Sequence, residues 1–143
     1  MKGGVRRQYL LVGIAGGIGT LCRYAAGEWL HFPGPLFVIL FINLSGSFLI
    51  GWLQAFSEPE SRFYLGPNAR LALMTGFCGG YTTFSTFSLL SYYSVQRAIW
   101  SDVFLNIVSS HVLGLSAVFA GYFASGAAVR VMETWARRRP HRR

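Results

Sequence analysis

The segment LALMTGFCGGYTTFSTFSLLSYYSVQ, residues 71–96, contains no Asp, Glu, Lys or Arg. It is long enough for one helical crossing of a bilayer, which takes about 20 mostly apolar residues. Gly79 and Gly80 lie near its centre, and adjacent glycines in a spanning helix favour a break that frees backbone carbonyl and amide groups. The segment therefore predicts a membrane-spanning helix that is interrupted near its middle, either by a simple kink or by a functional break.

Three further segments predict additional crossings. Residues 29–57 and 103–129 contain no acidic side chain, Lys or Arg, and residues 9–30 contain only Arg23 and Glu28. The connections between the segments are short, so no extramembrane domain is expected. We therefore expect an all-α integral membrane protein with one membrane domain, residues 1–143. Its spans lie at approximately 9–30, 35–56, 69–95 and 103–129, followed by a basic tail at 130–143.

Composition favours a membrane protein over a soluble one. Apolar residues make up 52% of the chain and charged residues 13%, about half of the charged share of soluble domains. A chain of 143 residues is too short to bury so much apolar surface in one water-soluble core. With three histidines and few acids, neither a zinc motif nor a catalytic triad can be assembled, so the sequence does not predict an enzyme.

The net charge of +8 comes from basic residues that flank the apolar segments. Four crossings place both termini on one side of the membrane. Arg97 is the only Lys or Arg in the connections on the opposite side. The positive-inside rule therefore predicts cytoplasmic termini for a multi-pass protein of the cell (inner) membrane, in contact with lipid headgroups. No basic or aromatic platform accompanies the tail, so nucleic acid is not an expected partner. The basic residues on the predicted cytoplasmic side are Lys2, Arg6, Arg7, Arg62, Arg70, Arg130, Arg137, Arg138, Arg139, Arg142 and Arg143.

Two patterns have structural interpretations. The N-terminus MKGGVRRQYLLVGIAGGIG is similar to a signal peptide, but three more apolar segments follow, which favours an uncleaved first span. Small residues also recur at four-residue spacing, which lets helix backbones approach closely in lipid and implies a helix bundle or a dimer. These pairs are Gly13 and Gly17, Ser47 and Gly51, Gly76 and Gly80, and Gly121 and Ser125.

Polar side chains inside the spans are costly in lipid and indicate function. Arg23 in the first span either extends to a nearby membrane interface or lies in a vestibule that attracts anions. Asn43 in the second span either joins neighbouring helices by hydrogen bonds or donates hydrogen bonds to an anion. Phe84 and Phe87 share one helix face, and hydroxyl residues are interleaved with them. Ring edges can contact an anion while hydroxyl and amide donors replace its water, and weak donors suit a site that must also release its ion. The interleaved hydroxyl residues are Thr83, Ser85, Thr86 and Ser88.

Two further sets of groups have open interpretations. Carbonyl groups freed by a break beside Thr82 are hard oxygen ligands that suit a hard cation such as sodium. In the fourth span, Asn106, Ser110 and His111 form a polar cluster that either joins helices or lines a pore.

Three stretches together resemble the CrcB/Fluc family of fluoride channels. They are GGIGTLCRY at 16–24, NLSGSFLIG at 43–51 and TGFCGGYTTFSTFS at 75–88, and the last is highly specific. The resemblance covers residues 9–130 and leaves out the basic tail. It implies passive export of fluoride from the cytoplasm, which limits its toxicity, through a dimer of two antiparallel subunits with two pores. It also implies a central sodium ion that is structural and is not transported.

The resemblance also implies residue roles. Gly79 and Thr82 would supply carbonyl oxygens to the sodium ion, and Asn43 would donate to fluoride. The pore-lining rings would be Phe84 and Phe87. The nearby hydroxyls would be those of Thr83, Ser85 and Thr86, and Arg23 would lie at the vestibule.

The sequence departs from the family pattern in two respects. Ile107, His111 and Leu115 occupy the face of the fourth span that carries serine and tyrosine in some relatives. The charge bias is also strong for a chain that inserts in both orientations. Either the tail arginines count for little because they come last, or the partner is an oppositely inserted paralogue instead of a second copy.

Two other functions compete with a channel. A proton-coupled exporter of the small multidrug-resistance type also has four spans and antiparallel dimers, but it needs a buried acid, for which Glu28 is the only candidate. A non-conducting assembly subunit would show no ion flux at all.

Overall fold

The computed structural model describes residues 2–31, 34–59 and 64–138, and every regular element in these ranges is helical. The predicted loop residue Arg62 and the tail residues Arg139, Arg142 and Arg143 lie outside the described residues. The elements in chain order are α1 (Lys2–Trp29), α2 (Pro35–Phe56), α3 (Pro67–Arg70), the π-helix η1 (Leu71–Cys78), α4 (Gly79–Tyr81), α5 (Phe84–Gln96) and α6 (Trp100–Arg138).

Three helices are long and apolar enough to cross a membrane: Gly4–Trp29, Pro35–Phe56 and Trp100–Met132. The expected third crossing is not one continuous helix. It consists of α3, η1 and α4 on one side of residues 82–83 and α5 on the other. The predicted all-helical fold with an interrupted third element is therefore confirmed, but the predicted place of the interruption was wrong: Gly79 and Gly80 are helical, and the chain becomes extended only at Thr82 and Thr83.

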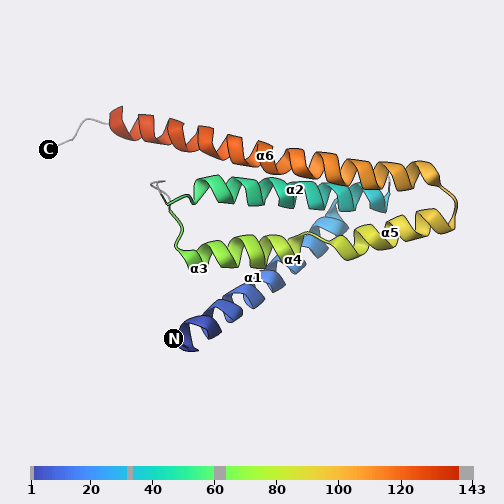
Figure 1. The fold of residues 1–143 in the computed structure, drawn as a ribbon, viewed down its shortest axis with the longest axis horizontal. Helices are drawn as coiled ribbons and strands as arrows, with labels where there is room; N and C mark the ends of the chain where they lie inside the picture. Colours follow the sequence, from blue (N-terminus) through green and yellow to red (C-terminus); the bar gives the residue numbers. More distant parts are fainter. Residues whose placement is uncertain (1, 32–33, 60–63, 139–143) are drawn as a thin grey trace.

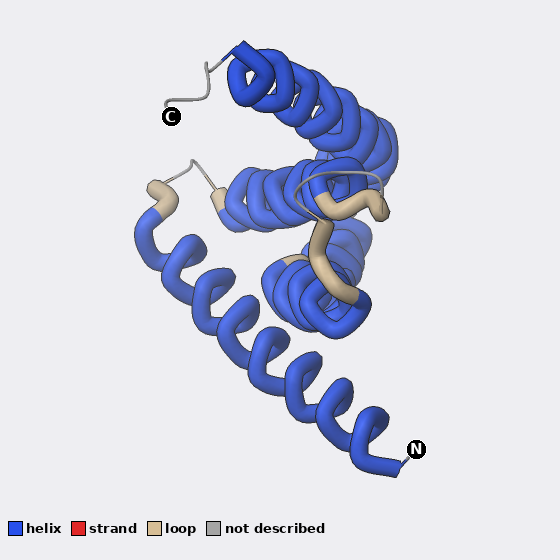
Figure 2. Tube along the Cα trace, turned by 90° about the vertical axis from the view of Figure 1, so that its left-hand side faces the viewer, coloured by secondary structure: helices blue, strands red, loops and turns tan. Residues whose placement is uncertain are grey.

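The helices form a bundle with one oblique member (Figure 1). The elements α2, α6 and the broken third element run roughly side by side, whereas α1 crosses them at an angle. Figure 2 shows the same divergence of α1 from the side. The most extensive contacts join α2 to α6 and α1 to η1 and α4. The start of α1, the end of α2, the start of α3 and the end of α6 lie at one end of the bundle, as an even number of passes requires.

Small residues bring the helix backbones into contact. A Cβ atom at Gly51 of α2 would overlap the Val118 carbonyl oxygen of α6, and one at Gly80 would overlap the Gly16 carbonyl oxygen of α1. In the first span, the contacts within the single chain do not fall on the predicted pair of glycines. Gly13 and Gly17 have nothing within 4 Å of a Cβ position, and Gly16 and Gly19 make the contacts instead. The broken helix crosses the face of α1 that carries Gly16, and the sequence spacing alone does not select that face.

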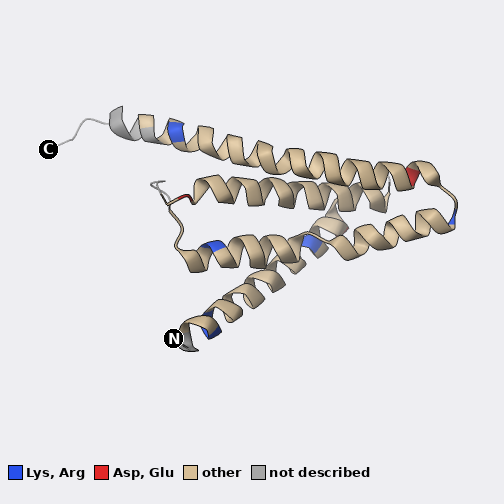
Figure 3. Cartoon of the chain, viewed as in Figure 1, with Lys and Arg blue, Asp and Glu red and all other residues tan. Residues whose placement is uncertain are grey.

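Much of the apolar surface faces outward. Among the described residues, the buried hydrophobic side chains are Ile42, Ala55, Cys78 and Phe87. Large apolar residues are exposed on every long helix, which fits a lipid environment. Basic residues lie mainly at the end of the bundle that holds both termini (Figure 3). Orientation in the membrane and the division into one membrane domain stay predictions.

Candidate functional site

The chain leaves the helical conformation at Thr82 and Thr83, between α4 and α5. Thr82 has ψ 160° and Thr83 has φ −145° and ψ 120°, so both residues are extended. Asn43 on α2 compensates for the lost helical bonds. Its Nδ2 donates to the Thr83 carbonyl oxygen at 3.1 Å, and its Oδ1 accepts from the Thr83 amide at 2.8 Å. One side chain therefore satisfies both backbone groups of Thr83, which would otherwise be unpaired.

A cluster of hydroxyl groups begins α5. The Thr83 hydroxyl accepts from the Thr86 amide at 3.2 Å and so caps the new helix. The same oxygen lies 3.1 Å from the Ser85 hydroxyl and 3.1 Å from the Thr86 hydroxyl. The structure thus brings together the three predicted hydroxyl residues. These hydroxyls are paired mainly with one another, and only Thr83 also borders the hollow described next.

A hollow of about 260 Å³ opens beside the break. The rings of Phe84 and Phe87 lie 5.4 Å apart between centroids, and Phe87 meets the His111 imidazole edge-on at 6.1 Å. Phe87 is buried, whereas Phe84 is 76% exposed. The lining contains no carboxylate, Lys or Arg, so it offers ring edges and neutral donors. The lining residues are Asn43, Ser47, Thr82, Thr83, Phe84, Phe87, Ser110 and His111.

Asn106 of α6 is buried behind this hollow. Its Nδ2 donates to the Phe87 carbonyl oxygen at 3.3 Å and to the Ser91 hydroxyl at 2.7 Å. Ser110, which lines the hollow, donates to Asn106 Oδ1 at 3.5 Å. Sequence reasoning gave Asn106 no defined role. The available signal was an amide followed by a hydroxyl one turn later in an apolar helix.

His111 lines the hollow with its ring, while its Nδ1 lies 2.7 Å from the Ile107 carbonyl oxygen. The neighbouring residues Ile107 and Leu115 are exposed and do not border the hollow. Arg23 also does not border it, although its Nε is buried and no hydrogen bond to this atom is found among the described residues. Arg23 therefore does not share this lining with Asn43, Phe84 and Phe87.

The break leaves several carbonyl groups at the end of α4. The Cys78 carbonyl accepts from the Thr82 amide at 3.0 Å and from the Thr82 hydroxyl at 2.9 Å. The Gly80 carbonyl accepts from Thr20 at 3.3 Å. Within the described ranges, no hydrogen bond to the carbonyl oxygens of Gly79, Tyr81 or Thr82 is found. Neutral oxygen atoms are suitable ligands for a hard cation. The carbonyl oxygens of Gly79 and Thr82, which the sequence led us to expect as ligands, therefore suit sodium.

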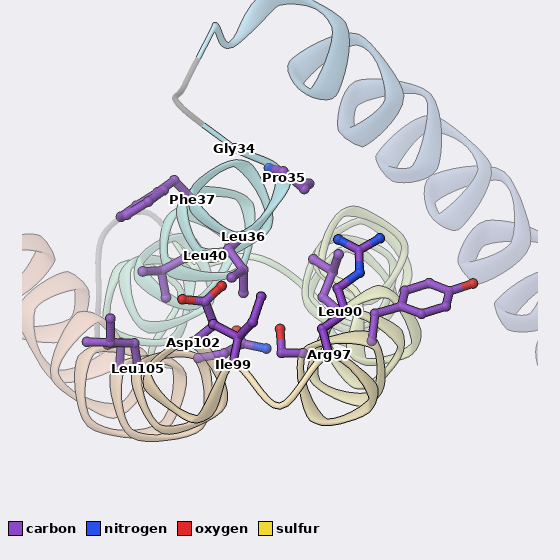
Figure 4. Close-up of a pocket in the computed structure, with 14 residues that line it drawn as sticks. Gly34, Pro35, Leu36, Phe37, Leu40, Leu90, Arg97, Ile99, Asp102 and Leu105 are labelled. Atoms are coloured by element: carbon purple, nitrogen blue, oxygen red, sulfur yellow. The ribbon is translucent and has the colours of Figure 1, made fainter.

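A second hollow of about 480 Å³ lies at the opposite end of the bundle from the termini, between the start of α2, the end of α5 and the start of α6 (Figure 4). Leucine side chains from all three helices line it, and Arg97 and Asp102 lie at its rim. Asn106 also borders this hollow, and it is hydrogen-bonded to Phe87 and Ser110, which line the hollow at the break.

The chain is a multi-pass membrane protein whose interior polar groups surround a break in a helix, and its relatives place it in the class of ion channels. Within that class it belongs to the CrcB family, because a sequence model described as "CrcB-like protein, Camphor Resistance (CrcB)" matches residues 10–122. Curated relatives support the assignment over nearly their whole length.

Three of these relatives carry the name fluoride-specific ion channel FluC. The protein of Gluconobacter oxydans is 36% identical over 133 residues, covering 87% of this chain and 92% of the relative. That of Rhizobium meliloti is 43% identical over 115 residues, covering 78% and 90%. That of Rhizobium etli is 42% identical over 120 residues, covering 80% and 92%.

Proposed function

We propose that this protein is a fluoride-selective channel that lets fluoride leave the cytoplasm passively. The observation that carries the proposal is the lining of the hollow at the helix break, which joins ring edges to neutral donors and holds no fixed charge. Relatives that share about 40% of the sequence are named as fluoride channels, which supports the choice of ion.

Fluoride is small and strongly hydrated, so a pathway for it must replace bound water with several compact donors. Asn43 uses one Nδ2 hydrogen for Thr83 and retains a second at the hollow. Ser47 adds a hydroxyl donor, and Phe87 adds a buried ring. Because each of these groups attracts an anion weakly, the ion can be released as readily as it is bound.

A structural sodium ion belongs to the same proposal. The carbonyl oxygens of Gly79 and Thr82 are the candidate ligands, and neither receives a hydrogen bond from any described residue, which supports this role. A bound cation would stabilise the end of α4, where the helix dipole is negative. The sodium ion is not transported.

The proposed assembly is an antiparallel dimer, either of two copies or of this chain with an oppositely inserted paralogue. Phe84 is 76% exposed in the single chain although it borders the hollow. A partner subunit would cover that ring and close the open side of the pathway. The side of α1 that carries Gly13 and Gly17 is also unoccupied within the described structure.

The alternative exporter of the small multidrug-resistance type has less support. Glu28, its only candidate proton carrier, is exposed near the end of α1 and does not border the hollow at the break. Replacing Glu28 with Gln should abolish a proton-coupled exporter and leave a channel active.

The deciding experiment is ion efflux from liposomes that contain the purified protein. We expect fast fluoride efflux and very little chloride efflux from matched vesicles. Equal fluxes of the two ions, or no flux of either, would contradict the proposal. Removing external and internal sodium should stop the fluoride flux, and indifference to sodium would contradict the assignment of Gly79 and Thr82.

A further inference from the structure

The hydroxyl group of Thr20 links the first span to the broken helix. Thr20 Oγ1 lies 3.0 Å from the Gly16 carbonyl oxygen, one turn earlier on α1, and 3.3 Å from the Gly80 carbonyl oxygen on α4. A hydroxyl carries one hydrogen, which these two acceptors share. Thr20 is the side chain through which α1 reaches the carbonyl end of α4.

This contact depends on a close approach of two backbones. A Cβ atom at Gly80 would overlap the Gly16 carbonyl oxygen, and one at Gly19 would overlap the Phe77 carbonyl oxygen. Because glycine occupies these positions, α1 and α4 touch along their main chains. This close approach brings the Thr20 hydroxyl within hydrogen-bonding distance of the Gly80 carbonyl oxygen.

The backbone groups around the break are distributed among different partners. Two side chains on other helices take part: Asn43 binds the amide and carbonyl of Thr83, and Thr20 binds the carbonyl of Gly80. The carbonyl oxygens of Gly79 and Thr82 receive no hydrogen bond within the described part of the chain. Thr20 thus acts on the carbonyl group next to a candidate sodium ligand.

We propose that Thr20 is a positioning residue for the sodium site. By holding the Gly80 carbonyl, its hydroxyl fixes the orientation of the last peptide groups of α4 and leaves the Gly79 and Thr82 carbonyls free to bind the ion. The inference rests on the proposed function, because it requires the sodium site.

The test compares Thr20→Val, which keeps the shape and removes the donor, with Thr20→Ser, which keeps the donor. Ser116→Ala is the matched control, because the Ser116 hydroxyl donates to Val112 within its own helix at 2.8 Å. Fluoride efflux is measured at a series of sodium concentrations. A neutral hydrogen bond is worth about 1 kcal/mol, so Thr20→Val should raise the sodium concentration for half-maximal flux about fivefold. Thr20→Ser and Ser116→Ala should stay close to the starting protein.

A second measurement does not depend on flux. The melting temperature of the detergent-solubilised protein is recorded against sodium concentration, and Thr20→Val should need more sodium to reach the same increase. If Thr20→Val does not fold, Thr20→Ala provides the same comparison. An unchanged sodium requirement in both measurements, or an equal loss in the serine variant, would overturn the role of Thr20. A starting protein that ignores sodium would instead overturn the sodium site itself, which separates the two failures.

Discussion

The side-chain amide of Asn43 both donates to the Thr83 carbonyl and accepts from the Thr83 amide, with N···O distances of 3.1 and 2.8 Å. This pair lies forty residues apart in sequence. It replaces the helical hydrogen bonds that Thr83 loses when the chain becomes extended. The residue expected as a fluoride donor is therefore also the residue that stabilises the break.

Asn43→Leu should impair both folding and flux. It leaves the Thr83 amide and carbonyl unpaired, and each buried unsatisfied group costs about 1–3 kcal/mol. We expect a lower melting temperature in detergent and loss of fluoride efflux from liposomes. Asn68→Leu is the control, because its bond to Gln8 at 3.1 Å lies away from the break. Normal stability and flux in Asn43→Leu would contradict the two-way pairing.

The two phenylalanines should respond differently to replacement by isoleucine. Phe84→Ile should slow fluoride efflux with little change in stability, because the ring is 76% exposed and makes few internal contacts. Phe87→Ile should slow efflux and also lower the melting temperature, because the ring is buried. Aromatic contacts are worth about 0.5–1.5 kcal/mol, so each loss should reduce the rate about two- to tenfold. Phe104→Ile, at another exposed ring, is the control, and unchanged flux in both test variants would refute ring contact with the ion.

The sequence predicted the helices for a clear physical reason, since uncharged runs of residues have few alternatives to a helix in lipid. It also predicted a break in the third run, but at Gly79 and Gly80, which are helical, whereas the chain becomes extended at Thr82 and Thr83. Sequence reasoning also identified Asn43, Thr83, Phe84 and Phe87, and the structure places all four at one hollow. Their roles in conduction stay predictions.

Other features depend on three-dimensional relations that the sequence does not contain. The contact between Thr20 and Gly80 depends on the angle at which α1 crosses the bundle, and no local pattern sets that angle. For the same reason, spacing indicated Gly13 and Gly17 as packing residues although the contacts fall on Gly16 and Gly19. The buried position of Asn106 requires α5 and α6 to lie side by side.

Asn106→Leu tests the polar link between the hollow at the break and α5. The change removes the donor to the Phe87 carbonyl and to Ser91 and leaves Ser110 without its acceptor. We expect a lower melting temperature and reduced fluoride efflux, because the backbone that carries Phe87 loses its support. Asn106→Gln retains the amide and should lose less in both measurements. Equal behaviour of the two variants would show that the size of the side chain matters and the amide does not.

Two glycines of α6 provide a final test of how the helices pack. A Cβ atom at Gly121 would overlap the Phe48 carbonyl oxygen of α2, whereas one at Gly126 would meet nothing within 4 Å. Gly121→Ala should therefore push α2 and α6 apart, which displaces Asn43 and Ser47 from the hollow at the break. An overpacked contact costs about 1–3 kcal/mol, so the melting temperature and the flux should both fall. Gly126→Ala adds the same methyl group on the same helix and should leave both close to the starting protein. Tolerance of alanine at Gly121 would mean that α2 and α6 do not pack at the distance described, and the position of Asn43 relative to the break would have to be revised.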